Sequence, residues 1–186
     1  MDFQIAQAVP LIVVLGCGAL AAVSDIRTMR VRNALTVPLI FGGILFHAVT
    51  PLGNGWAFGL GGASVGFLLL FVLFLLGGIG AGDVKLLTGV GAWLGPSAVF
   101  FVFLAAGLLA GFVSLVIVVK GRSFSETWHR FRVMWFQVVS LSKYVAADDN
   151  VEVACNNSRE RHRLIPFGAV IFVATIAVAL VIVLAR

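Results

Sequence analysis

Two aspartates draw attention because they stand at the ends of apolar stretches in a chain of 186 residues. Asp25 closes the first apolar stretch and Asp83 opens the fourth. A charged side chain at the centre of a membrane helix costs about 2.5–3.5 kcal/mol on insertion scales, so such residues mark functional sites. Two carboxyl groups held close together share one proton, and one accepts a proton from water while the other donates to a carbonyl oxygen. The pair therefore has the groups that hydrolysis of a peptide bond requires.

Each acid also has a purely structural explanation at this stage. Asp25 would be a helix-end residue that faces Arg27 or Arg30 in water, and Asp83 would be the N-cap of the fourth helix. Two other functions stay open: a small transporter component in which the acids bind a proton or cation, and a catalytically silent subunit of a secretion machine. Transporters usually hold such acids near the midplane, between repeated halves. Here both acids lie at an edge, and no internal repeat is visible.

The elements that position the acids follow from composition. Apolar residues make up 61% of the chain and charged residues 11%, with a mean hydropathy of +1.10. Soluble domains are about 45–50% apolar and about 25% charged. The sequence therefore predicts an all-α, polytopic membrane protein, and it excludes a soluble domain, a disordered tail and a disulfide-stapled module. The net charge of +5 fits membrane-flanking loops, so no nucleic-acid partner is expected.

About six transmembrane helices are expected. The fourth apolar segment reaches only about 20 Å as a helix, short of a hydrocarbon core of about 30 Å. Gly95-Pro96 separates it from the fifth, because a proline inside a helix breaks it. The six segments are residues 3–23, 34–52, 56–79, 84–95, 97–119 and 164–185.

The distribution of basic residues predicts the orientation of these spans. With six spans and the N-terminus outside, every lysine and arginine except Arg186 falls in an inner loop. Both termini are then outside, and both acids lie at the cytoplasmic face, where they can meet if helices one and four pack together. The chain is expected to form a single transmembrane domain, residues 1–186.

The cytoplasmic loop at residues 120–163 contains a helical pattern. An amphipathic helix at about 124–145 is expected to lie on the inner leaflet; a substrate-docking role stays open. Its apolar stripe is spaced by four and three residues in alternation: Phe124, Trp128, Phe131, Trp135 and Val138.

The residues around Asp83 suggest how a peptide would approach it. Gly80 and Gly82 precede the acid in a GxGD string, and two glycines let backbone approach closely and adopt a positive φ. An extended peptide could lie against that bare backbone by strand-like pairing. Asn33 is expected to cap the second helix or to support the site, and Lys85 to anchor the membrane edge or to support the site.

Other kinds of site lack their signature. His47, His129 and His162 are scattered, with no HExxH string. Cys17 and Cys155 form no CxxC pair. The sequence predicts no metal site and no cofactor.

Four strings together resemble the type IV prepilin leader peptidase family of GxGD-type aspartic membrane proteases. Residues 24–27 (SDIR) and 31–36 (VRNALT) look like its first signature, and 80–86 (GAGDVKL) like its second. Residues 163–168 (RLIPFG) resemble a third, more degenerate motif. The resemblance implies a multi-span protease that uses two aspartates and no metal to cut leader peptides at the cytoplasmic face of the bacterial inner membrane.

By that resemblance Asp25 and Asp83 are the catalytic pair, and Gly80 and Gly82 shape the site. The implied substrate is a prepilin-like protein with a basic leader and an apolar transmembrane helix. The family usually has proline before the asparagine of the first signature, where this chain has Arg32. Larger members carry a methyltransferase domain with CxxC pairs, so the chain resembles the short, peptidase-only members that serve tight-adherence (Flp-type) pili.

Overall fold

The computed structural model describes residues 2–28, 31, 33–50, 55–75, 79–120 and 167–184. Within these ranges the regular structure is entirely helical, which confirms the expected all-α class. The expected helix at 124–145 lies outside the described residues, and so does the 120–163 loop apart from its first residue. The helices are α1 (Asp2–Thr28), α2 (Asn33–Val49), α3 (Trp56–Leu75), α4 (Ala81–Lys120) and α7 (Phe167–Leu184).

The described helices fit a membrane protein. Three stretches are long and apolar enough to cross a bilayer: Ala8–Thr28, Trp56–Leu75 and Ala81–Val116. Asn33–Val49 and Phe167–Val181 are shorter apolar helices. The six-span arrangement stays a prediction.

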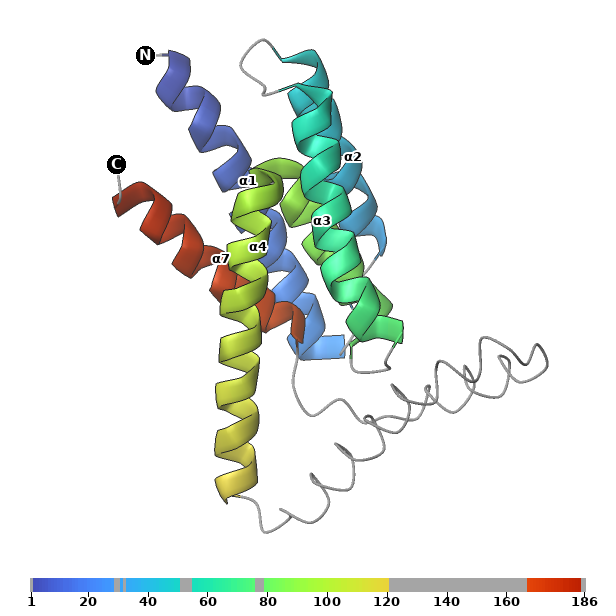
Figure 1. Cartoon of the computed structure of the whole chain (residues 1–186), viewed down its shortest axis with the longest axis vertical. Coiled ribbons are helices and arrows are strands. Elements are labelled where there is room, and N and C mark those ends of the chain that lie inside the picture. The colour runs from blue at the N-terminus through green and yellow to red at the C-terminus, as the bar shows by residue number, and fades with distance from the viewer. Residues whose placement is uncertain are drawn as a thin grey trace, which may run out of the picture.

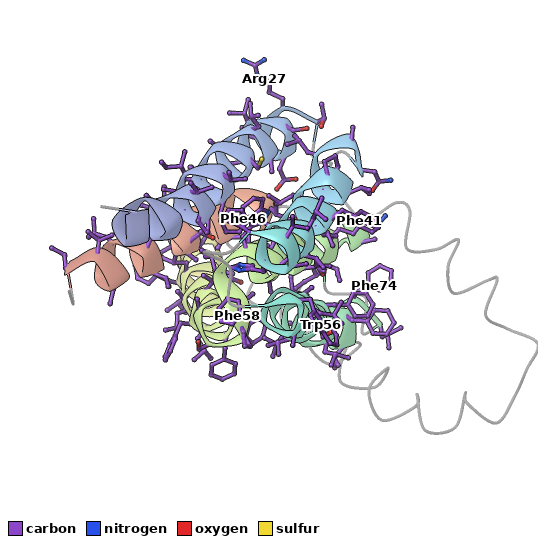
Figure 2. All side chains as sticks on the ribbon, turned by 90° about the horizontal axis from the view of Figure 1, so that it is seen from above. Arg27, Phe41, Phe46, Trp56, Phe58 and Phe74 are labelled. Atoms are coloured by element: carbon purple, nitrogen blue, oxygen red, sulfur yellow. The ribbon has the colours of Figure 1, made fainter. Side chains whose placement is uncertain are left out.

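The bundle carries apolar side chains on its outside as well as in its core. Phe41 and Phe74 are exposed and lie at the periphery of the bundle in Figure 2. Helices that are apolar on all sides are typical of membrane spans. The fully buried side chains include Leu70, Leu86, Leu87, Val90, Val99 and Ile171, from α4 and from the helices α3 and α7 that pack against it.

The expected break at Gly95-Pro96 is confirmed. Gly95 has φ 84° and ψ 175°, which is not helical. In Figure 1 the chain turns back there, so that the two halves of α4 run in opposite directions. A side chain at Gly95 would also overlap the ring of Phe58. The first half of α4 is therefore a separate short helix, with Asp83 in its first turn.

Glycines let the first half of α4 pack closely against α3. Gly62 and Gly91 face each other backbone to backbone, and a Cβ at Gly66 would lie 2.6 Å from the carbonyl oxygen of Leu87. Helices in lipid associate through small residues of this kind. The short helix that carries Asp83 is therefore packed tightly against α3.

Candidate active site

Asp25 lies in the last turn of α1 and points into the bundle. Its side chain is 1% exposed, on the same helix face as the buried Ala21 and Ala22. Arg27 points away from the bundle (Figure 2), and Arg30 lies outside the described residues. The explanation of Asp25 as a helix-end residue facing an arginine in water is therefore wrong, because the helix turns the carboxyl inward.

One carboxylate oxygen of Asp25 is held by the start of α7. The backbone N–H of Gly168 donates to Oδ2, with an N···O distance of 2.8 Å. Gly168 is the second residue of α7, and the first N–H groups of a helix have no acceptor within it. A carboxylate placed there is favourable because of the helix dipole. The other oxygen, Oδ1, is buried and makes no hydrogen bond to a described residue.

Asp83 lies inside α4, in its first turn. The helix begins at Ala81, so Asp83 is its third residue and the interpretation of Asp83 as N-cap is wrong. Gly80 precedes the helix, and its carbonyl oxygen accepts from Asp83 N at 3.0 Å and from Val84 N at 3.3 Å. Gly80 N–H donates to Asp83 Oδ2 at 3.4 Å, as the third residue does in a capping box.

Helical spacing explains why Asp83 is 0% exposed. Leu86, Leu87 and Val90 follow it at i+3, i+4 and i+7, and all three are buried. These positions share one face of a helix, so the face that anchors α4 in the core also carries the acid inward.

The two glycines act differently from what the sequence suggested. Among the described residues the glycines with positive φ are Gly55 and Gly95, so the expected positive φ is not found at Gly80 or Gly82. Gly82 does permit a close approach: a Cβ there would lie 3.1 Å from Cβ and 3.3 Å from the carbonyl oxygen of Val31.

Val31 lies between the starts of α4 and α7. On one side it meets Gly82, the residue before Asp83. On the other side a Cβ at Gly168 would come within 3.2 Å of Val31 Cγ2 and within 2.9 Å of Asp25 Oδ2. Figure 1 shows the end of α1 and the starts of α4 and α7 in the same part of the bundle. The structure thus brings the segments that carry Asp25 and Asp83 to one end of the bundle, with Val31 next to Gly82 and Gly168.

The two supporting residues meet directly. Lys85 Nζ donates to Asn33 Oδ1 at 3.0 Å, at the exposed edge of the bundle. Asn33 is the first residue of α2, and Lys85 is two residues after Asp83. The bond ties the start of α2 to the first turn of α4.

Among the histidine candidates, the structure describes His47. No group of three metal-ligating side chains occurs among the described residues, and His129 and His162 lie outside them. His47 is buried next to the break in α4, with Nε2 3.0 Å from the carbonyl oxygen of Trp93. Its ring packs edge-on against Phe58.

An open depression of about 270 Å³ lies between α1 and α2. Asp25 is not part of its wall, because the lining residues of α1 lie on a different face of that helix. Its lining is Leu20, Val23, Ser24, Arg27, Thr28 and Leu35. The depression is therefore separate from the two acids.

Sequence reasoning missed the contribution of Gly168. The string at 163–168 indicates only a family resemblance, because a backbone N–H leaves no side-chain signature. The available signal was Pro166 near the start of the last apolar stretch, since proline marks a helix start and the free N–H groups that follow it.

Comparison with known proteins gives one consistent result. Residues 12–115 match the type IV leader peptidase family. The chain is 36% identical over 104 residues to the prepilin leader peptidase/N-methyltransferase of Aeromonas hydrophila, an alignment that covers 50% of this chain and 34% of the relative. It therefore spans about a third of that relative's length. No solved structure gives a significant match.

Two further relatives extend the comparison. The prepilin leader peptidase/N-methyltransferase of Bacillus subtilis (strain 168) is 30% identical over 115 residues, covering 61% of this chain and 46% of the relative. Leader peptidase HopD of Salmonella typhimurium (strain LT2) is 35% identical over 112 residues, covering 56% of this chain and 72% of the relative. The matched region 12–115 contains both Asp25 and Asp83.

Proposed function

Because the chain belongs to the type IV leader peptidase family, we propose that it is an aspartic endopeptidase that cleaves the leader peptide from type IV prepilin-like precursors. The observation that carries the proposal is the burial of two carboxyl side chains, Asp25 at 1% and Asp83 at 0% exposure, at one end of a largely apolar bundle. Buried acids of this kind are costly unless they are used. The names of the relatives supply the substrate class.

The proposed reaction needs one water molecule and one shared proton. One carboxylate takes a proton from the water, whose oxygen attacks the scissile carbonyl carbon, while the other carboxyl donates its proton to the carbonyl oxygen. The tetrahedral diol then collapses: the C–N bond breaks, the leaving nitrogen receives the proton taken from water, and the second acid regains its proton from a diol hydroxyl. The products are a free leader carboxyl group and a new amino terminus.

The site is proposed to act at the cytoplasmic face of the bacterial inner membrane. Both acids lie at ends of apolar stretches, Ala8–Thr28 and Ala81–Val116. The positive-inside pattern of the sequence puts that end in the cytoplasm and both termini outside. The proposed substrate has a basic leader in the cytoplasm and an apolar helix in the bilayer. Its scissile bond would then reach the acids at the boundary between the cytoplasm and the bilayer.

Gly80, Gly82, Asn33 and Lys85 are proposed to hold this arrangement. Gly80 accepts the first backbone bonds of α4, and Gly82 lets Val31 approach the turn that carries Asp83. The bond from Lys85 to Asn33 limits movement of α4 relative to α2. A metal or other cofactor has no part in the proposed reaction.

Co-expression with a prepilin-like precursor tests the proposal. The wild-type chain should shorten the precursor on a gel, and Asp25→Asn or Asp83→Asn should each abolish the shift while the protein stays in the membrane. Asp149→Asn, in the 120–163 segment, is the matched control and should cleave normally. Cleavage that survives either site substitution would refute the mechanism. A cation flux that depends on both aspartates, without cleavage, would favour a transporter component instead.

A further inference from the structure

We infer that the start of α7 holds Asp25 in its working orientation, with Gly168 as the positioning residue. The inference rests on the proposed function and assigns to α7 a part in the reaction. Asp25 and Gly168 are 143 residues apart in the chain, and the hydrogen bond between them is buried, with an N···O distance of 2.8 Å. A short bond from a backbone donor fixes the rotation of the carboxyl group, because the donor itself is fixed by the helix.

The bond gives the two carboxylate oxygens of Asp25 different roles. Oδ2 is occupied by Gly168 N–H. Oδ1 is buried and makes no hydrogen bond to any residue in the described part of the chain. Buried polar atoms normally have a partner, and an exception in a native protein points to water or to a catalytic role. Proton exchange with the attacking water therefore passes through Oδ1.

Glycine is required at 168 by space and not by backbone conformation. Gly168 is not among the described glycines with positive φ, and alanine is the better helix former. A Cβ at this position would lie 2.9 Å from Oδ2 and 3.2 Å from Cγ of Asp25. Such a Cβ would push the carboxyl away from its donor, so only glycine combines the N–H contact with the observed approach.

A packing explanation competes with this one, and a second substitution, chosen from the structure, can distinguish the two. The same Cβ would also lie 3.2 Å from Cγ2 of Val31. If Gly168 matters only because α7 must pack against Val31, then shortening Val31 restores the space that Gly168→Ala removes. If the contact with Asp25 matters, Val31→Ala restores nothing, because the overlap with Oδ2 remains.

Steady-state cleavage by the purified full chain in lipid vesicles tests the inference. Gly168→Ala should lower kcat at least tenfold and leave KM within twofold, since the bond orients a reacting group and does not hold the substrate. Gly168→Ala combined with Val31→Ala should stay as slow. Gly107→Ala is the control, because nothing lies within 4 Å of a Cβ there. A wild-type kcat in Gly168→Ala, or its recovery in the double variant, would overturn the inference.

Two measurements keep the inference falsifiable if Gly168→Ala fails to fold or if the chain cleaves no prepilin. Replacing Gly168 by glycolic acid exchanges the N–H for an ester oxygen without adding a side chain, and it should lower kcat as Gly168→Ala does. Hydrogen exchange at the Gly168 amide needs no substrate: the amide should exchange slowly in the wild type and at least tenfold faster in Asp25→Ala. A wild-type kcat in the ester variant would overturn the inference. Equal exchange in both proteins would also overturn it, and that result does not depend on what the chain cleaves.

Discussion

Polar side chains are buried at both ends of the short first half of α4, but the two ends differ in whether these side chains have hydrogen-bond partners. At the Gly95 end, the His47 ring has Trp93 O as a hydrogen-bond partner, and Trp93 Nε1–H donates to Leu39 O at 2.8 Å. At the other end, Asp25 Oδ1 is buried without a hydrogen bond to a described residue. Satisfied buried groups stabilise a fold, whereas unsatisfied ones cost free energy. The comparison teaches that the Gly95 end is built for stability and the acid end for chemistry.

The largest expected effect separates activity from stability at the acid end. Asp25→Asn and Asp83→Asn should each lower the cleavage rate by about 10² to 10⁴-fold, the usual contribution of a general acid or base. Removing a buried charge relieves a desolvation cost, so the melting temperature of the detergent-solubilised protein should stay the same or rise. A melting temperature that falls together with activity would show that the acids are structural.

At the other end of this short helix, Gly95→Ala should lower stability and leave activity unchanged, which is the opposite of the pattern expected for the aspartate variants. The backbone of Gly95, with φ 84° and ψ 175°, lies in a region that is nearly restricted to glycine and costs a residue with a Cβ about 1–3 kcal/mol. Overlap with the Phe58 ring adds about 1–3 kcal/mol of overpacking. We expect a marked loss of thermal stability, with kcat per folded molecule close to wild type. Gly107→Ala is the matched control. An unchanged melting temperature would remove the structural role assigned to this turn.

His47→Leu should also lower thermal stability without a loss of kcat, but by less than Gly95→Ala. It removes the ring nitrogen near Trp93 O while keeping an apolar side chain, so a buried carbonyl loses a partner at a cost of about 1–3 kcal/mol. Thermal unfolding with cleavage measured in parallel would check this. A kcat that falls more than the stability accounts for would mean that His47 takes part in the reaction.

Lys85→Met should have the smallest effect. Its hydrogen bond to Asn33 is exposed, and a single hydrogen bond contributes a net of about 1 kcal/mol, so kcat should fall by about threefold to fivefold. Asn33→Leu should do the same. The double variant should be no slower than either single one, because both remove the same bond. Multiplicative losses would show that the two residues act separately.

Much of this architecture could be predicted from local signals. Hydropathy predicted the helical class and the membrane, and Pro96 predicted the break in α4, because proline lacks the N–H that a helix needs. The positions of Asp25 and Asp83 at stretch ends predicted that they would share one end of the bundle. These inferences needed only the order of residues along the chain.

The details of the site could not be predicted in this way. Apolar residues begin at Val84, but the helix begins three residues earlier, because hydropathy does not register glycine and a buried acid as helical. The contact of Gly168 with Asp25 joins distant segments through a backbone atom, which no residue type announces. Asn33 and Lys85 were singled out separately, and only the packing of α2 against α4 pairs them.

The central claim is that Asp25 and Asp83 act as one unit on one peptide bond. The most direct test compares cleavage rates of Asp25→Asn, Asp83→Asn and the double variant with a prepilin-like precursor in vesicles. Residues that share one step are not additive, so the account predicts that the double variant is no slower than either single variant. Independent losses that multiply, or a single variant that cleaves at the wild-type rate, would contradict it.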